Sequence, residues 1–256
     1  MMMKKIKKTK ISIGILSVII SISFISCSPL WLKFSGVLEE EPNLKYISNG
    51  NKNITFVPIH HIGRKVYYER LKGMMDSLNK SGYLIYYETV KTNLKDTNEI
   101  AKYYRKFRKI QGNLDAGGNY LDTINNKIYG RIKYPEKYDL INQPSYPELI
   151  SDSLNAVNAD LKIEDIINAF EKNEGTIKLN DCDRNTKLND DYNCKQIDKE
   201  KKKIFREEYV LNLRNKNLAN KIEQSDYKNF LIIYGSRHFK GLKKELKEID
   251  SKWKKK

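Results

Sequence analysis

The sequence contains few histidines, few cysteines and only one long apolar run, and each shortage narrows what the protein can do. Three histidines and three cysteines occur among 256 residues. The apolar run, residues 11–25, is too short to span a membrane comfortably. Beyond the first ten residues, a dense basic tract for nucleic-acid binding is also lacking, because the lysines are spread widely and gather only in 199–203 and 254–256.

The first 26 residues are organised as an export signal. Five lysines and no acid precede the apolar run. The run ends in Ser23-Phe-Ile-Ser-Cys27, which resembles a bacterial lipobox with Cys27 as the lipidated residue. By resemblance to lipoprotein sorting rules, Ser28 favours the outer membrane. We therefore expect a signal peptide over 1–26 and a palmitate-bearing lipoprotein of the bacterial cell envelope, held to the membrane by its N-terminal lipid. An uncleaved N-terminal anchor is the alternative.

Removal of the signal lowers the net charge of the protein without changing its sign. The signal holds five of the 48 Lys and Arg residues, so 43 remain against 32 Asp and Glu, and the net charge falls from +16 to +11. A dispersed excess of this kind favours contact with anionic surfaces over nucleic-acid recognition. We expect no nucleic-acid partner.

Two cysteines, Cys182 and Cys194, remain in an Asp- and Asn-rich loop once Cys27 is assigned to lipid. In an oxidising compartment they are predicted to form a local disulfide. A zinc site would need two further ligands, and no histidine lies nearby. The loop begins like a calcium-binding EF-hand, but Thr186 stands where that loop needs glycine and Tyr192 where it needs glutamate, which argues against calcium.

Apolar runs of strand length alternate with helical patterns, which predicts an α/β fold. A tether over 27–51 leads into one domain over 52–252, followed by a basic tail over 253–256. Residues 112–196 are polar and irregular at first and helical later, and we expect them to form an inserted lobe or lid. The predicted core is a central sheet built from strand–helix–strand units with helices on its faces. Strands are expected at 53–59, 83–88 and 230–234, and helices at 67–78, 96–110, 198–224 and 239–249.

All three histidines lie at two similar strand-to-helix junctions. His60 and His61 lie in Thr55-Phe-Val-Pro-Ile-His-His-Ile-Gly63, and His238 lies in Leu231-Ile-Ile-Tyr-Gly-Ser-Arg-His-Phe-Lys-Gly241. A single histidine at a helix start is most often a satisfied polar residue. Concentration of every copy at two such junctions favours a functional site, since histidine is the usual acid–base group near neutral pH.

Three polar groups are expected to meet where the predicted strands end. His61, with His60 as the alternative, follows the first strand, Glu88 ends the second and His238 follows the last. Ligands of open α/β sheets bind outside these strand ends. Two imidazoles and a carboxylate are suited to a divalent metal, or to metal-free acid–base catalysis. Arg214, at the border of the apolar stripe of 198–224, is suited to an anionic substrate group or a developing oxyanion.

These residues resemble the TraB/Tiki superfamily, which includes GumN-like, ChaN-like and erythromycin-esterase-like proteins. The family has two Gly-x-x-His motifs, a Glu after the first and an Arg in a late helix. Gly235-Ser-Arg-His238 matches the second motif, and Glu88 and Arg214 stand at the expected places. The first motif departs, because Pro58 replaces its glycine if His61 is the motif histidine. The resemblance covers both ends of the domain, and the middle of the domain does not match the family.

The resemblance implies three functions. The first is a metal-dependent hydrolase of peptide or ester bonds, in which His61, Glu88 and His238 bind Mn, Co, Fe or Zn and Arg214 steadies the substrate or intermediate. The second, suggested by the ChaN-like branch, is a surface lipoprotein that binds haem or iron through the same histidines. The third is a non-catalytic signalling or inhibitory protein with a vestigial site, which the missing first glycine permits.

Overall fold

The structure, a computed structural model, describes residues 32, 34–112, 120–130, 132–150 and 155–256. The predicted signal peptide over 1–26 and the lipidation site Cys27 lie outside these residues. No helix in the described part of the chain is long and apolar enough to cross a membrane.

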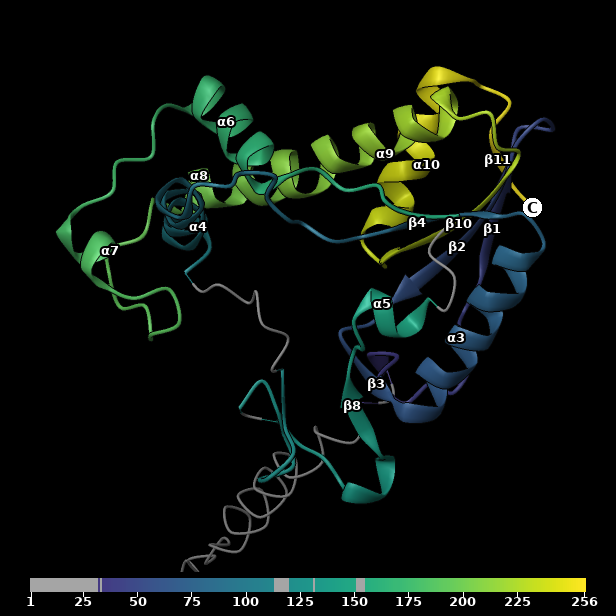
Figure 1. Cartoon of the computed structure of the whole chain (residues 1–256), viewed down its shortest axis with the longest axis horizontal. Helices are drawn as coiled ribbons and strands as arrows, with labels where there is room; N and C mark the ends of the chain where they lie inside the picture. The colour runs from purple at the N-terminus through teal and green to yellow at the C-terminus, as the bar shows by residue number, and fades with distance from the viewer. Residues whose placement is uncertain (1–31, 33, 113–119, 131, 151–154) are drawn as a thin grey trace, which may run out of the picture.

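A six-stranded mixed sheet carries helices on both faces, which confirms the predicted α/β fold (Figure 1). β2 (Asn53–Ile59) pairs in parallel with β10 (Asn229–Gly235), and β10 pairs in parallel with β4 (Leu84–Tyr87). Buried β-branched and aromatic residues favour strands here. The carboxyl ends of these three strands therefore lie at one edge of the sheet. The strand order is β11 (Lys254–Lys255), β1 (Lys45–Ser48), β2, β10, β4, β9 (Ala156–Asn158).

The outer strands come from segments that the sequence did not predict as sheet. β1 lies within the expected tether and pairs antiparallel with β2. β11 lies within the expected basic tail and pairs with β1, next to the fully buried Trp253. β9 lies within the expected 112–196 lobe and pairs in parallel with β4, so this segment also completes the sheet. Each strand has four residues or fewer, which is too short to show a period of two in the sequence.

Alternate residues of β10 point to opposite faces of the sheet and bury two groups of helices. Phe230, Ile232 and Tyr234 pack with α9 (Leu213–Gln224) and α10 (His238–Ile249). Leu231 and Ile233 pack with α3 (Lys65–Lys80) and α5 (Tyr146–Leu149) on the other face. Ile249, the last residue of α10, is 48 % exposed.

A second apolar core forms a lobe beside the sheet (Figure 1). α4 (Thr97–Gln111) is capped by Asp96, whose side chain accepts hydrogen bonds from the backbone of the first helical turn. The predicted helix 198–224 is interrupted: α8 (Lys199–Ile204) continues as the π-helix η2 (Phe205–Asn212) and then as α9. π-Helical turns are rare and occur often at functional sites. The lobe also contains α6 (Ile163–Glu174) and α7 (Asp181–Asn185).

The remaining short elements form a layer under the carboxyl edge of the sheet. They pack around Leu32, Ile62 and Leu140. The elements are β3 (Ile62–Arg64) paired with β8 (Leu140–Asn142), the three-stranded β5 (Leu121–Asp122), β6 (Lys127–Ile128) and β7 (Ile132–Lys133), and the 3-10 helix η1 (Glu136–Tyr138).

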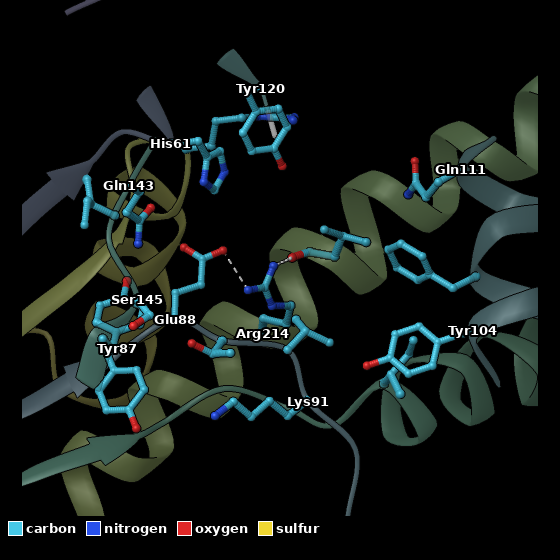
Figure 2. Close-up of a pocket in the computed structure, with 18 of the residues that line it drawn as sticks. His61, Tyr87, Glu88, Lys91, Tyr104, Gln111, Tyr120, Gln143, Ser145 and Arg214 are labelled. Carbon is cyan, nitrogen blue, oxygen red and sulfur yellow. Dashed lines mark hydrogen bonds and ion pairs between the residues drawn. The ribbon is translucent and has the colours of Figure 1, made fainter. Parts of the chain in front are cut away.

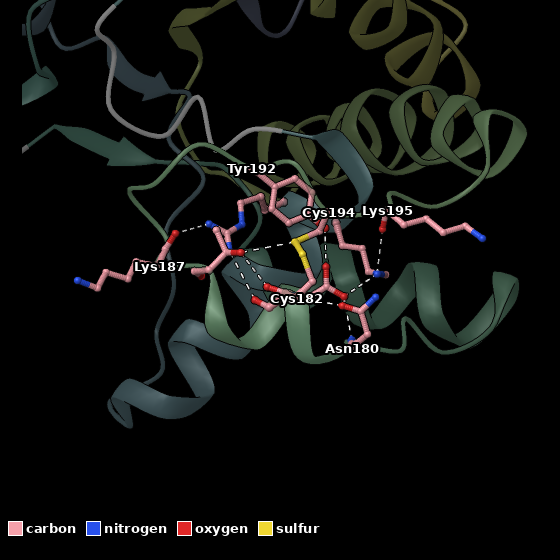
Figure 3. The surroundings of a disulfide bond; sticks show 10 residues. Asn180, Cys182, Lys187, Tyr192, Cys194 and Lys195 are labelled. Carbon is pink, nitrogen blue, oxygen red and sulfur yellow. Dashed lines mark hydrogen bonds and ion pairs between the residues drawn. A yellow bond between two sulfur atoms is a disulfide. The ribbon is translucent and has the colours of Figure 1, made fainter.

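The predicted disulfide joins Cys182 to Cys194 in the lobe (Figure 3). It encloses a polar network in which buried Asp183 accepts hydrogen bonds from Lys109 and Tyr192, both at 2.5 Å. Lys109 also donates to the carbonyl of Lys195 at 3.1 Å. The disulfide loop is therefore tied to the end of α4 by one buried carboxylate.

Replacing both cysteines by serine is expected to lower the free energy of unfolding of the lobe by about 2–3 kcal/mol, because the unfolded chain loses its cross-link. Urea unfolding with and without dithiothreitol measures the change. Dithiothreitol should destabilise the wild type and leave the Cys182→Ser/Cys194→Ser variant unaffected. A wild type insensitive to the reductant would contradict a structural role for this disulfide.

Candidate functional site

Glu88 and His238 meet at the carboxyl edge of the sheet. Glu88 directly follows β4, and His238 begins α10 after the turn that leaves β10. Since β4 and β10 are neighbours, their ends bring Glu88 Oε1 to 3.4 Å from Nε2 of His238. The backbone N–H of Gly235 donates to the other carboxylate oxygen, Oε2, at 2.6 Å. The predicted convergence of these two side chains is present in the structure.

His238 is buried, and its orientation is fixed by a residue that the sequence did not single out. Its Nδ1 lies 2.8 Å from Oδ1 of Asn215, a buried residue of α9. The amide oxygen accepts, so Nδ1 carries a hydrogen and Nε2 is the nitrogen left to exchange a proton. Nε2 is also the nitrogen that faces Glu88. This arrangement directs proton exchange to the carboxylate side of the ring.

Gly241 leaves room for Asn215. A Cβ placed on Gly241 would lie 2.0 Å from Nδ2 of Asn215, and both residues belong to helices that pack closely. Glycine normally weakens a helix, so its presence in α10 is explained by this close approach. Gly241, three residues after the Gly-x-x-His motif, thus shapes the support of His238.

Gly241→Ala is expected to destabilise the protein by about 1–3 kcal/mol, because the new methyl group overpacks the α9–α10 contact. Gly73→Ala is the matched control, since Gly73 lies in α3 with no heavy atom within 4 Å of the added Cβ. The free energy of unfolding of the control should rise by up to about 1 kcal/mol, because alanine favours a helix more than glycine does. Chemical unfolding of both variants measures the contrast, and equal effects would contradict the packing described.

Arg214 ties Glu88 to a second carboxylate, Asp160. Its Nε and Nη2 donate to the two oxygens of Asp160 at 2.7 and 2.6 Å, and Nη2 also donates to Oε1 of Glu88 at 2.7 Å. Nη1 donates to the carbonyl of Val210 in η2 at 3.1 Å. Arg214 and Asp160 are 5 % and 4 % exposed, so this ion pair is held away from water. Arg214 therefore points into the interior of the protein.

The surroundings of Glu88 favour its charged form. Burial by itself raises the pKa of Glu88, but the contact with His238, the charge of Arg214 and the N–H of Gly235 outweigh burial and hold that pKa well below its ordinary value. Burial likewise opposes the charge of Arg214, yet its bonds to Asp160 and Glu88 raise its pKa. Glu88 is therefore a carboxylate across the neutral range.

The lowered pKa of Glu88 predicts acid sensitivity. A carboxyl whose pKa is lower in the folded state stabilises the protein above its ordinary pKa of 4.5, and this contribution is lost as the pH falls below that value. The fall in unfolding free energy between pH 7 and the acid range should be smaller in Glu88→Gln than in the wild type. An identical pH dependence of the two proteins in denaturant titrations would contradict the lowered pKa.

The first histidine junction does not mirror the second. In the pairing of β2 and β10, Gly235 lies opposite Ile59, so His238 corresponds in position to Ile62 and not to His61. Ile62 begins β3, which pairs with the distant strand β8 and comes between β2 and α3 in the chain. The chain therefore does not pass directly from strand to helix here, contrary to the expectation from the sequence. The intervening strand β3 has three residues, which is too short to recognise in the sequence.

His61 and His60 line the smaller cavity together with Glu88 and His238 but do not take part in the ion pair of those two residues. His61 is exposed, faces the same cleft as Glu88, and packs on Tyr120 with ring centroids 5.2 Å apart (Figure 2). His60 is half-buried with Nε2 3.9 Å from Glu39. Burial lowers the pKa of His60, an effect that Glu39 partly offsets. Neither histidine contacts His238 in the way the predicted metal set requires.

The donor arrangement does not fit the divalent ion expected from the sequence. Among the residues that the structure describes, no three His, Cys, Asp or Glu side chains lie close enough together to hold a metal ion. Both oxygens of Glu88 already accept hydrogen bonds, and the Arg214 guanidinium, 2.7 Å from Oε1, would repel a cation bound there. The same groups are well suited to acid–base chemistry without a metal.

A cleft of about 950 Å³ opens above Glu88 and Arg214, between the sheet and the lobe (Figure 2). Tyr87 and Ser145 line one side, and Tyr104 and Gln111 line the other. A smaller cavity of about 360 Å³ shares Glu88 and Arg214 with the cleft and reaches His238. A ligand in the cleft can therefore contact Glu88 and Arg214, which also line the cavity beside His238.

Two supporting residues were missed in the sequence. Asp160 follows β9, a three-residue strand whose place beside β4 depends on tertiary structure. The residues around Asp160 show no helix or strand periodicity that would mark it as part of a site. Asn215 follows Arg214 in the chain, and only the packing of α9 on α10 brings it to His238.

Comparisons with known proteins give no relative for this chain. No family model matches it, and no curated protein or solved structure shows significant similarity to it.

Proposed function

We propose that the protein is an exported, lipid-anchored hydrolase that cleaves an ester or amide bond, with His238 as the acid–base group and no metal ion. The observation that carries the proposal is the fixed position of His238 between Asn215 and Glu88, at 2.8 and 3.4 Å, beside an open cavity. Resemblance of Gly235–His238, Glu88 and Arg214 to the TraB/Tiki superfamily supports the same reading. The erythromycin-esterase-like branch implies hydrolysis of an ester with a histidine and acidic residues.

In the proposed reaction, Nε2 of His238 accepts a proton from a water molecule whose oxygen attacks the substrate carbonyl carbon. The carbonyl electron pair moves to oxygen and forms an oxyanion. When the oxyanion collapses, the carbonyl re-forms, the bond to the leaving oxygen or nitrogen breaks, and Nε2 returns the proton to the leaving group. Glu88 balances the positive charge that the imidazole carries between these steps.

Arg214 is suited to stabilise the oxyanion. A guanidinium has five N–H groups, and its four hydrogen bonds to Asp160, Glu88 and Val210 leave one N–H of Nη1 for a substrate. Arg214 lines both cavities. Because Asp160 fixes the guanidinium, the donor is oriented before substrate binds, which is the arrangement that stabilises a developing charge.

A hydrolysis screen of chromogenic esters and amides tests the proposal. The full-length protein in detergent micelles should hydrolyse at least one of them, and His238→Gln should lose that activity. Glu69→Gln, an exposed change in α3, is the matched control and should retain it. Activity that survives in His238→Gln would overturn the assignment of the acid–base group.

The lipid anchor is a separate part of the proposal. Labelled palmitate should be incorporated into the wild-type protein in a bacterial host and not into Cys27→Ser. Cys194→Ser is the control cysteine change and should still be labelled. Label in Cys27→Ser would contradict the anchor.

A further inference from the structure

Resting on the proposed hydrolase function, we infer that the substrate is an amphipathic anion: an ester or amide with an apolar or aromatic body and at least one negative charge. The charged groups that line the large cleft carry this inference. Among the described residues of the lining, four are cationic and Glu88 is the one carboxylate. The cations are Lys91, Arg206, Arg214 and Arg237.

Lys91 has a side chain that is available to a ligand. Arg214 pairs with both Glu88 and Asp160, so its positive charge is fully balanced and the three groups together carry one negative charge. Lys91 lies across the cleft floor from this cluster, is exposed, and makes no ion pair within the described part of the chain (Figure 2). Its backbone is fixed, because its carbonyl accepts a hydrogen bond from Ile163 at 2.9 Å. The cation is thus held at the cleft without an internal counter-ion.

Arg206 and Arg237 place further positive charge near the reacting groups. Both contact the same carboxylate, Glu207, at 3.5 and 3.8 Å, so two positive charges share one negative charge. Arg237 immediately precedes His238 and lines both the cleft and the smaller cavity. These long, exposed contacts are weak, and an anionic ligand can replace Glu207 in them.

The apolar part of the lining explains why the substrate must be more than a small anion. Tyr87 and Tyr146 stack with ring centroids 4.4 Å apart on one wall. Tyr104 and Phe107, both from α4, line the cleft as well. Aromatic side chains bury apolar surface and leave polar edges for hydrogen bonds. A cleft with aromatic walls and uncompensated cations matches an apolar body that carries an acidic group.

Two fluorescent probes with the same rings test the charge requirement. Anilinonaphthalene sulfonate carries a negative charge, and phenylnaphthylamine is its neutral counterpart. The sulfonate should bind the full-length protein more tightly than the neutral probe. Lys91→Gln/Arg237→Gln should weaken sulfonate binding roughly tenfold, at about threefold for each exposed charge, and leave the neutral probe unaffected.

Lys240→Gln/Lys243→Gln is the matched control, since these lysines of α10 do not line the large cleft; they line a groove that shares only Arg237 with it. The control should bind both probes like the wild type. Equal affinity of the two probes, or loss of sulfonate binding in the control pair alone, would overturn the inference. The probes contain no hydrolysable bond, so sulfonate binding that persists in an inactive protein would reject the hydrolase and leave the anion site standing.

Discussion

Replacing Arg214 by methionine is expected to lower the free energy of unfolding by about 3–5 kcal/mol, because the change leaves a buried carboxylate without its partner. Asp160 is 4 % exposed and has both oxygens bound to Arg214. Methionine keeps much of the volume of arginine and removes the charge, so the loss reports on the ion pair. Urea unfolding at neutral pH measures it.

Two further variants separate loss of charge from loss of packing. Arg214→Met/Asp160→Leu should recover part of the lost stability, since no unpaired charge remains in the core. Arg70→Met is the surface control: Arg70 pairs with Glu41, its side chain is 43 % exposed, and its loss should cost less than about 1 kcal/mol. An effect of Arg214→Met as small as that of Arg70→Met would show that the pair with Asp160 is not formed.

Glu88→Gln is expected to reduce kcat/KM about 10²- to 10⁴-fold on any substrate found by the screen, because His238 loses the charge that balances its protonated form. Glutamine keeps the size of the side chain and the acceptor for Gly235. The loss should fall on kcat more than on KM, since Glu88 is proposed to act when the proton is transferred.

Binding of the sulfonate probe provides the control for the Glu88→Gln experiment. A folded variant should bind this probe at least as well as the wild type, because the cleft has lost a negative charge. Wild-type kcat in Glu88→Gln would remove the carboxylate from the mechanism. Loss of both activity and probe binding would instead indicate a damaged cleft.

The central strands and the pair at their ends could be predicted because their signals are local. β2 has the predicted bounds, and β10 exceeds its prediction by one residue at each end. Long apolar runs stopped by polar residues identify buried strands. Glu88 and His238 follow such runs, and the rule that parallel strands share a carboxyl edge was enough to bring them together.

The support of the site could not be predicted, because it depends on contacts between distant segments. Asp160 reaches Arg214 only after the short strand β9 pairs with β4. His61 looked equivalent to His238 in sequence, but the pairing of β3 with β8 redirects the chain before α3 begins. The π-helix η2 also changes the register of a helix that apolar periodicity showed as continuous.

Haem binding and a non-catalytic role remain predictions from the family resemblance. His238 is 3 % exposed, so a haem bound through it would require the ring to leave Glu88. Exposed His61 beside Tyr120 is the more accessible ligand. A Soret band that appears on haem addition and is lost in His61→Ala would favour this function, and an unchanged spectrum would remove it.

The most direct test of the central claim is a double-mutant cycle of His238 and Glu88 on the best substrate from the screen. If Glu88 acts through His238, His238→Gln/Glu88→Gln should have nearly the same kcat/KM as His238→Gln alone, because the carboxylate has no further role once the imidazole is gone. Additive losses in the double variant, or single variants as active as the wild type, would contradict the account.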